Sequence, residues 1–144
     1  MIQAIWTEDT QSQIYQDSVA IRFEIFIDEQ GYPDYSELDE LEEETIHLVL
    51  YEDEQAIATN RIYQINNDTY RIERVAVRKI ARKRGLGERL LKEAEAKIIE
   101  LGGRNITIKS EDIAIEFYKR FGYKPVGAEI MEYGFSHQAM TKEI

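Results

Sequence analysis

Residues 71–92, RIERVAVRKIARKRGLGERLLK, contain the turn on which our prediction of the fold depends. The segment RIERVAV has the pattern of a β-strand, and LGERLLK begins an amphipathic helix. The turn between them carries Gly85 and Gly87. Glycines let a backbone approach a ligand closely, and the unpaired N–H groups of a helix N-terminus attract anions. The segment therefore predicts an anion-binding turn between a strand and a helix.

The basic residues around this turn contrast with the rest of the chain, whose net charge is -10. They are Arg78, Lys79, Arg82, Lys83 and Arg84. An acidic chain is poorly suited to general nucleic-acid binding, because the phosphate backbone would be repelled. Its long-range field favours small cationic partners.

Composition predicts one soluble globular domain over residues 1–144, with 43% hydrophobic and 32% charged residues. We find no signal-peptide pattern and no apolar run long enough to cross a bilayer, so we expect no membrane partner. The absence of cysteine excludes disulfides, thiolate metal sites and a cysteine nucleophile, and it fits a cytoplasmic location. His47 and His137 lie far apart with no metal-ligand spacing, so we expect no metal.

The hydrophobic patterns predict an α+β fold with α/β-like layers, built on a mostly antiparallel sheet. The expected strands are residues 2–6, 45–51, 55–65, 70–77, 104–109, 123–135 and 136–143. We expect one or two helices within 10–28, one at 86–101, and one that Asp112 caps and Gly122 ends. In the first helical region, Ile14, Val19, Phe23 and Phe26 are expected to lie roughly on one face.

The segment Asp28–Glu44 holds nine acidic residues and no Lys or Arg. Gly31 and Pro33 predict a loop near its start. Two interpretations stay open at this point. The segment is either a solvated acidic surface or a rim that attracts a cationic acceptor.

Two motifs resemble the GNAT superfamily of N-acetyltransferases. Residues 77–87, VRKIARKRGLG, are similar to the family's pyrophosphate loop, Arg/Gln-x-x-Gly-x-Gly/Ala, with Arg82, Gly85 and Gly87 at the motif positions. Residues 114–123, AIEFYKRFGY, resemble its A-x-x-F-Y-x-x-x-G-F signature, with tyrosine in the last place. The interval between them leaves room for one helix and one strand, as that fold requires.

Further segments resemble the ElaA-like branch of this superfamily. They are RFEIFIDEQ at 22–30, His47-Leu48, and HQAM at 137–140. The resemblance implies the GNAT fold, with about seven strands splayed between the fourth and fifth and about four flanking helices. It implies an acetyl-CoA-dependent N-acetyltransferase that transfers an acetyl group to a primary amine by direct attack in a ternary complex, since no cysteine can form an acetyl-enzyme.

Two other functions stay open. One is a non-catalytic CoA-binding regulatory or interaction module of the same fold. The other is an acidic interaction domain whose basic turn binds a different phosphate or a nucleic acid. The sequence does not identify the amine, and its terminal strands could pair with a second copy in a homodimer.

The resemblance also implies which residues bind the coenzyme. The pyrophosphate loop supplies Arg82, Lys83, Arg84, Gly85, Leu86, Gly87 and Glu88, with Leu86 turned inward as an anchor. Val75, Ala76 and Val77 line the pantetheine arm, which pairs with the splayed strand as an extra strand. Backbone N–H groups near Val75 polarise the thioester carbonyl.

For catalysis, the resemblance makes Tyr118 the acid that protonates the leaving thiolate, although a packed aromatic is the alternative. The base is left open among Glu73, Glu29, His47 and His137. Glu73 is expected to share the face of Val75 and Val77, because side chains alternate along a strand.

One position departs from the family pattern. Where the family often has Asn, or Gln in this branch, this chain has Ser110-Glu111. An ionised carboxylate cannot donate a hydrogen bond. Glu111 could face away, accept from a pantetheine N–H or weaken coenzyme binding, and Ser110 could supply the missing donor.

Overall fold

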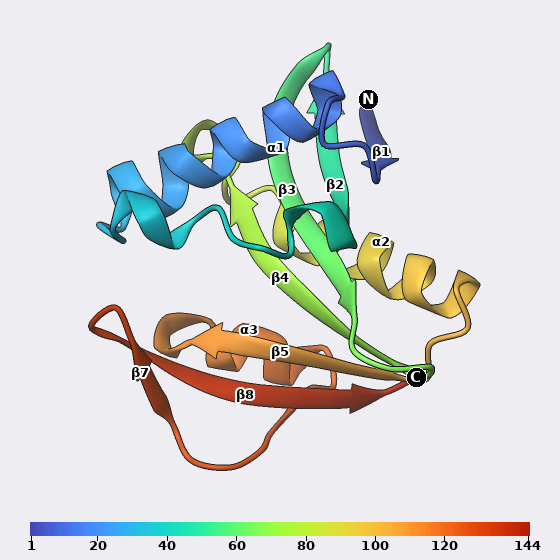
Figure 1. Ribbon diagram of the computed structural model, residues 1–144, viewed down its shortest axis with the longest axis vertical. Coiled ribbons are helices and arrows are strands. Elements are labelled where there is room, and N and C mark those ends of the chain that lie inside the picture. Colours follow the sequence, from blue (N-terminus) through green and yellow to red (C-terminus); the bar gives the residue numbers. More distant parts are fainter.

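The computed structural model describes residues 1–144, and one open mixed sheet of eight strands forms its centre (Figure 1). The strand order is β1-β2-β3-β4-β5-β8-β6, and the short strand β7 also pairs with β8. Only β4 and β5 run parallel. The expected α+β, mostly antiparallel architecture is therefore confirmed.

The strands are β1 (Ile2–Thr7), β2 (Thr45–Glu52), β3 (Gln55–Gln64), β4 (Thr69–Val77), β5 (Asn105–Glu111), β6 (Lys124–Pro125), β7 (Ile130–Glu132) and β8 (Phe135–Glu143). The prediction of one strand over residues 123–135 is wrong. Gly127 and Gly134 take positive φ angles of 73° and 84°, and the chain turns away between β6 and β7. The two short strands pair with separate parts of β8, which raises the strand number from about seven to eight.

The α-helices are α1 (Gln13–Arg22), α2 (Leu86–Glu100) and α3 (Ile115–Arg120). A π-helix (Phe23–Glu29) continues α1, and 3₁₀ turns lie at Asp34–Ser36, Glu42–Glu44, Lys79–Ala81 and Asp112–Ala114. No helix is long and apolar enough to span a membrane. The predicted cap at Asp112 is wrong, because α3 begins after Ala114 and no side chain caps it.

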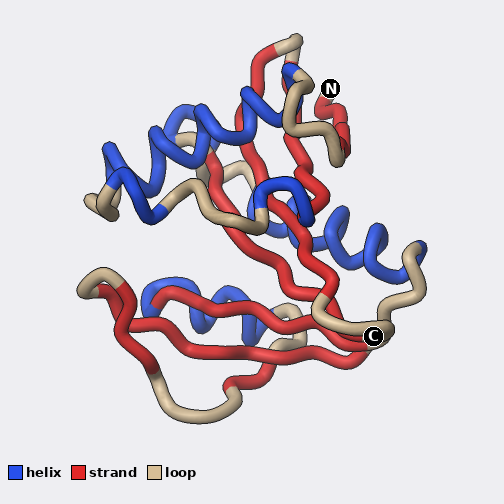
Figure 2. The backbone as a smooth tube through the Cα atoms, in the orientation of Figure 1, coloured by secondary structure: helices blue, strands red, loops and turns tan.

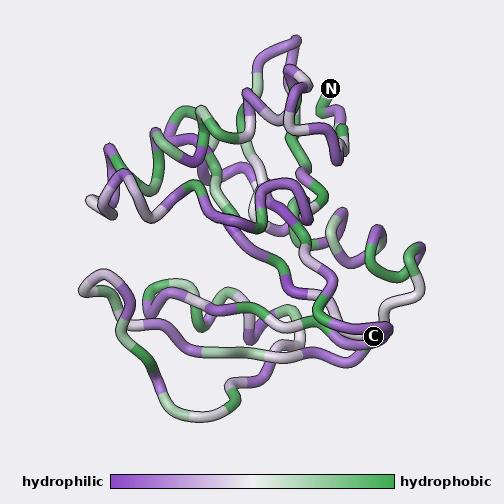
Figure 3. The backbone as a smooth tube through the Cα atoms, viewed as in Figure 1, coloured by the Kyte–Doolittle hydropathy of each residue, from purple (hydrophilic) through white to green (hydrophobic).

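Helices α1 and α2 cover opposite faces of the first half of the sheet (Figure 1). In β2, Leu48 and Leu50 pack in the cluster of α2, whereas Val49 and Tyr51 pack in the cluster of α1. This alternation is the two-residue period of a strand buried on both faces. Hydrophobic and hydrophilic stretches alternate along α2, as its amphipathic pattern predicts (Figure 3).

The buried face of α1 differs from our prediction. Its buried residues are Ser18, Ile21 and Arg22. The four predicted residues, Ile14, Val19, Phe23 and Phe26, are partly buried, and Ile14 and Phe26 pack against the same cluster as Ile21. Hydrophobic periodicity missed the face because two of the three buried side chains are polar.

Strands β4 and β5 pair at one end and separate at the other. Their register runs from Thr69↔Asn105 to Ile72↔Ile108 and no further. Figure 2 shows the two strands converging near the C-terminus and diverging away from it. The expected splay between the fourth and fifth strands is confirmed, and Val75, Ala76 and Val77 lie on β4 beyond the last pair with β5.

Candidate active site

The glycine turn forms an uncapped helix N-terminus. Gly85 precedes α2 with φ 76°, a left-handed conformation that favours glycine. No side chain caps the helix, so the first N–H groups of α2, at Leu86, Gly87 and Glu88, lack intrahelical partners. The Leu86 side chain is buried against Leu90, as predicted, and anchors the turn.

Gly87 is needed for close packing. A Cβ atom at this position would lie 3.3 Å from Cζ of Phe117, on α3. The second glycine therefore lets α2 approach the aromatic residue of the other predicted motif. The two sequence motifs meet in space at this contact.

A cavity of about 590 Å³ opens beside the turn, and we call it the glycine-turn cavity. Its lining includes Glu29, Gln30, Val75, Ala76, Val77, Arg82, Lys83, Gly85, Leu86, Gly87, Glu88, Glu111, Phe117 and Tyr118. Every predicted coenzyme residue lines it except Arg84 and Ser110. The structure thus brings the turn, the splayed part of β4 and Tyr118 to one cavity.

Two basic side chains of the turn are held by carboxylates. Both terminal nitrogens of Arg82 donate to Glu29 at 2.6 Å, and its Nε donates to the carbonyl of Val77 at 3.0 Å. Arg84 pairs with Glu52 in the same bidentate way. Solvent screens exposed pairs of this kind, which therefore contribute little to stability, so a phosphate can compete for them.

The backbone of β4 bulges at the open end of the splay. Arg61 pairs with Glu73 and Thr59 with Ala76, so two residues of β4 face one residue of β3. Arg74, within the bulge, has φ 55°. An extra residue inverts the alternation of side chains beyond it.

The expectation that Glu73 shares the face of Val75 and Val77 is therefore wrong. Val75 and Val77 pack against the α2 side, whereas Glu73 accepts from Arg61 on the opposite side. In the antiparallel ladder, Arg78 N–H donates to the carbonyl of Ile57, so alternation directs the backbone groups of Val77 toward the open edge. Because the ladder with β5 ends at Ile72, this edge of β4 beyond it can pair with an extended ligand, apart from the Val77 carbonyl, which accepts from Arg82.

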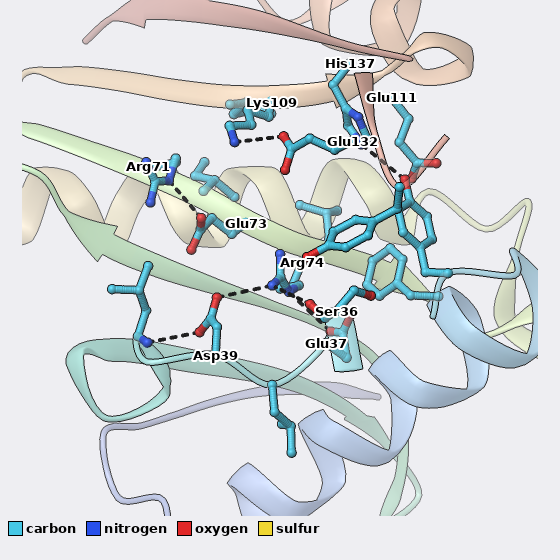
Figure 4. Close-up of a pocket in the computed structure, with 18 of the residues that line it drawn as sticks. Ser36, Glu37, Asp39, Arg71, Glu73, Arg74, Lys109, Glu111, Glu132 and His137 are labelled. Atoms are coloured by element: carbon cyan, nitrogen blue, oxygen red, sulfur yellow. Dashed lines mark hydrogen bonds and ion pairs between the residues drawn. The ribbon is translucent and has the colours of Figure 1, made fainter. Parts of the chain in front are cut away.

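A second cavity, of about 580 Å³, lies on the other side of the splay, and we call it the acidic cavity (Figure 4). Its lining includes Tyr32, Tyr35, Glu37, Asp39, Glu40, Arg71, Glu73, Arg74, Lys109, Glu111, Glu132, Tyr133 and His137. Four residues line both cavities: Val75, Glu111, Ala114 and Tyr118. The two spaces therefore meet between β4 and β5.

A buried ion-pair network supports the floor of the acidic cavity. Arg22 is fully buried and donates to Glu37 at 2.6 Å and to Glu42 at 2.9 and 3.0 Å. Arg61, also buried, donates to Asp39, Glu42 and Glu73. Neither interpretation of the acidic segment anticipated this role. Several of its carboxylates neutralise buried arginines instead of facing only solvent or ligand.

The network sets the charge of its carboxylates. Burial alone would raise the pKa of Glu42, but hydrogen bonds from Arg22 and the charges of Arg22 and Arg61 outweigh burial and bring the pKa to about 2. For Glu37 burial prevails and raises the pKa, despite the same arginine. The segment is thus fixed in place by electrostatics that depend on partners distant in sequence.

Tyr118 lies at the junction of the two cavities. Its ring is only 6% exposed and stacks edge-on against Phe117 and Tyr123, so the predicted packing alternative is correct for the ring. Its hydroxyl makes no hydrogen bond within the chain. Burial, and next the charge of Glu111, raise the pKa of the phenol, which therefore stays protonated at neutral pH. A protonated phenol can donate.

The structure separates three of the four candidate bases from the junction. Both oxygens of Glu73 accept from guanidinium groups, of Arg61 and Arg71, at 3.0 and 2.8 Å. Glu29 lies at the glycine turn, where hydrogen bonds from Arg82 lower its pKa. The guanidinium of Arg82 occupies both oxygens of Glu29, as two arginines occupy those of Glu73.

His47 lines neither cavity and is fully buried. Its Nε2 donates to the carbonyl of Glu42 at 3.0 Å, and burial lowers its pKa. His47 therefore has a structural place in the strand. We do not propose it as the base.

His137 lines the acidic cavity. Its Nδ1 lies 3.1 Å from the carbonyl of Phe135, which can only accept, so Nδ1 carries a proton. Its Nε2 lies 3.1 Å from the hydroxyl of Tyr32. Tyr32, which sequence reasoning missed, follows the π-helix and stacks on Phe135 at 4.2 Å between ring centroids. The only signal in the sequence for Tyr32 is its place directly after residues 22–30, the segment that resembles the ElaA-like branch.

Ser110 and Glu111, the two residues at the departure from the family pattern, have different surroundings in the structure. Ser110 is buried, lines neither cavity and donates to the carbonyl of Glu111 at 2.8 Å, so its role in binding coenzyme stays a prediction that the cavity geometry does not support. Glu111 faces inward, to both cavities. Oriented with its nitrogen toward the carboxylate, the Gln30 amide donates to Glu111 at 3.2 and 3.3 Å. Burial raises the pKa of Glu111.

No group of three or more His, Cys, Asp or Glu side chains is arranged to hold a metal ion. The site therefore presents backbone donors and basic side chains at one end. At the other end it presents a phenol and a carboxylate.

Comparison with known proteins gives consistent matches. Residues 10–144 match the family model described as an acetyltransferase (GNAT) domain. The uncharacterized N-acetyltransferase YjcF of Bacillus subtilis is 30% identical over 129 residues, which cover 89% of this chain and 91% of that protein. A Lactobacillus plantarum crystal structure, named as an N-acetyltransferase, is similar with a TM-score of 0.91 at 26% identity, covering 99% and 97% of the two chains.

Two further structures share the fold at lower identity. Escherichia coli ElaA matches with a TM-score of 0.87 at 21% identity, over 99% of this chain and 100% of its own. An aminoglycoside 6'-N-acetyltransferase in complex with coenzyme A matches with a TM-score of 0.76 at 18% identity, over 99% and 96%. The expected likeness to ElaA is confirmed for the fold.

Proposed function

This chain belongs to the GNAT acetyltransferase family, and from that membership we propose that it transfers the acetyl group of acetyl-CoA to a primary amine. The amine attacks the thioester directly, in a ternary complex. Coenzyme A occupies the glycine-turn cavity, and the amine enters through the acidic cavity. The coenzyme A bound to the aminoglycoside acetyltransferase of the same fold supports this proposal.

The observation that carries the proposal is the uncapped N-terminus of α2 facing the glycine-turn cavity. The N–H groups of Leu86, Gly87 and Glu88 offer three adjacent donors to a pyrophosphate, and the helix dipole adds partial positive charge. When coenzyme A binds, the Arg82 guanidinium releases Glu29 and pairs with a phosphate of the coenzyme. Lys83 and Arg84 lie beside it and add positive charge.

The pantetheine arm pairs with the open edge of β4 at Val75–Val77 and brings the thioester to the junction. Backbone N–H groups at the bulge donate to the carbonyl oxygen as negative charge develops on it. Tyr118 stays protonated because its pKa is raised, so it can deliver a proton to the departing thiolate. Each group is placed before the reaction begins, which lowers the entropy lost at the transition state.

A two-stage experiment tests this function. Acetyl-CoA should raise the melting temperature of the protein, and a screen of amines and peptides with a thiol reagent should find acceptors that release free coenzyme A. Mass spectrometry should then detect an acceptor that is about 42 Da heavier, because one acetyl group has replaced one hydrogen. A coenzyme-induced shift without any acetylated product would favour the non-catalytic binding module, and the absence of both would disprove the proposal.

A further inference from the structure

Glu111 has a position that no other acidic residue shares. It is the one carboxylate that lines both cavities, because it lies at the end of β5 where that strand diverges from β4. It is also adjacent to the Tyr118 phenol, whose pKa it raises. A group that moves a proton between amine and thioester must be located at this junction.

The partners of Glu111 leave it able to accept a proton. The carboxylates around it are neutralised by cations: Glu132 by Lys109, Glu73 by two arginines, and Glu37 by Arg22. Glu111 forms no ion pair with any Lys or Arg. Burial raises the pKa of Glu111 and outweighs the charge of His137 and the hydrogen bond from Tyr32, which both lower it. The Gln30 amide beside it is neutral.

From this geometry we infer that Glu111 is the general base of the reaction, and that it binds the acceptor as an ammonium ion before taking its proton. The inference rests on the proposed function. Tyr32 and His137 are positioning residues that hold the carboxylate at the junction and can carry its proton away. This role would explain why the chain has a carboxylate where related sequences often have an amide.

The protons balance in the following way. Glu111 takes one proton from the ammonium ion and leaves a neutral amine with a free electron pair. The amine nitrogen forms the C–N bond, the C–S bond breaks, and the electron pair of that bond leaves on the thiolate. The second proton lost by nitrogen reaches the sulfur through the Tyr118 phenol. The proton on Glu111 returns to solvent, and the products are an amide and a thiol.

A chain of hydrogen bonds is available for that return. The Tyr32 hydroxyl has one proton, which it donates to the ionised Glu111. Once Glu111 is protonated, that hydroxyl proton can turn to Nε2 of His137, which accepts it in the neutral ring because Nδ1 carries the other ring proton. A protonated Glu111 can in turn donate to the oxygen of Tyr32, which lies beside it. The charged and titratable groups that face this set are Tyr118 from α3, Glu132 from β7 and Arg74 from β4.

The test compares wild type with Glu111→Gln, which keeps the shape of the side chain and removes its basicity. Thiol release from acetyl-CoA is measured with tyramine, with 1,4-diaminobutane and with water as the only acceptor. We expect the variant to release thiol about 100-fold more slowly at neutral pH, the lower limit for loss of a general base. Its dissociation constant for coenzyme A should stay unchanged.

The pH profile distinguishes a base from a structural residue. Wild-type rates should fall as pH drops through the pKa of Glu111, since the protonated carboxyl cannot accept. For the amine probes, the deficit of the variant should shrink about tenfold per pH unit toward the amine's own pKa near 10, where free amine is already abundant. A variant that is merely misfolded would show a constant deficit.

Two further variants complete the experiment. Glu111→Asp keeps the carboxylate and should recover part of the rate together with the acidic limb of the profile. Glu116→Gln makes the same chemical change on the exposed face of α3 and should match wild type. Coenzyme affinity lowered by Glu111→Gln, with the rate at saturation unchanged, would identify Glu111 as a coenzyme ligand and overturn the inference.

The outcomes also separate this inference from the proposed function. An active wild type with an equally active Glu111→Gln variant would overturn the role of Glu111 alone. A wild type that releases no thiol with these probes or with any amine or peptide of the screen, and that acetyl-CoA does not stabilise, would overturn the acetyltransferase proposal and this inference with it.

Discussion

The glycine-turn cavity and the acidic cavity are nearly equal in volume, yet they are assembled in different ways. The first takes most of its functional atoms from one continuous segment, residues 75–88. The second gathers side chains from the π-helix, the acidic segment and strands β4, β5, β7 and β8. Local backbone geometry creates the first, and contacts between distant residues create the second. The two should therefore fail in different ways when they are mutated.

The largest effect should come from the network beneath the acidic cavity. Arg22→Met removes the buried guanidinium that pairs with both Glu37 and Glu42 and leaves them only Arg74 and Arg61. Removal of one partner from a buried ion pair typically costs about 3–5 kcal/mol of unfolding free energy. Urea denaturation measures this change. Coenzyme affinity of the folded fraction should be little altered, since the glycine turn does not contact this network.

Arg89→Met is the matched control, because Arg89 pairs with Glu93 on the exposed surface of α2. Loss of such a pair should cost no more than about 0.5 kcal/mol. A similar, small loss for both variants would show that the acidic cavity does not depend on its buried ion pairs.

The next largest effect should be a loss of unfolding free energy when the wild-type protein is acidified. The pKa of Glu42 is about 2 in the folded protein and near 4.3 in unfolded chains. A lowered pKa stabilises the fold above the unfolded value, so this contribution of about 2–3 kcal/mol should disappear as pH falls from about 4.5 to about 2. Glu37 has a raised pKa and contributes with the opposite sign.

Denaturation across this pH range checks the acid transition against Glu42→Gln. The variant has lower stability at neutral pH, but its stability should decline less steeply below about pH 4.5, where the wild-type carboxylate takes up its proton. Parallel pH curves for the two proteins would contradict the assignment of this transition to Glu42.

The same distinction explains what the sequence could reveal. The glycine turn and α2 were predictable because a local motif and a three-four periodicity specify them, and the splay was predictable because the resemblance to the GNAT superfamily implies it. The buried face of α1 was not, because Ser18 and Arg22 are polar, and only their partners Thr59, Glu37 and Glu42 make their burial favourable. Those partners lie 15 to 41 residues away in the sequence.

The site shows the same limit. One inserted residue near Arg74 moved Glu73 to the opposite face from Val75, and no alternation rule predicts a bulge. Glu111 stood out in the sequence as a departure from a pattern. Its function could be argued only when Tyr32 and His137, from two distant segments, were placed around it.

A smaller effect is expected at the glycine turn itself. Gly85→Asp puts a carboxylate where the pyrophosphate should bind, so coenzyme A affinity should fall about 30-fold, or about 2 kcal/mol, by calorimetry. Gly127→Asp is the matched control. Gly127 has a similar φ of 73°, with open space around it, in a turn distant from both cavities. Equal affinity losses in the two variants would indicate backbone strain instead of charge repulsion.

The smallest effect should appear where the two cavities meet. Tyr118→Phe removes the phenolic proton and keeps the packed ring, so coenzyme A affinity should stay constant while kcat falls about tenfold. The loss is modest because a thiolate, with a thiol pKa near 8.5, leaves readily and can take its proton from water. Tyr123→Phe is the control, since its hydroxyl bonds Glu95 outside both cavities and should affect stability alone. Equal turnover by Tyr118→Phe and wild type would remove the phenol from the reaction and leave Glu111 as the only side chain that links the two cavities chemically.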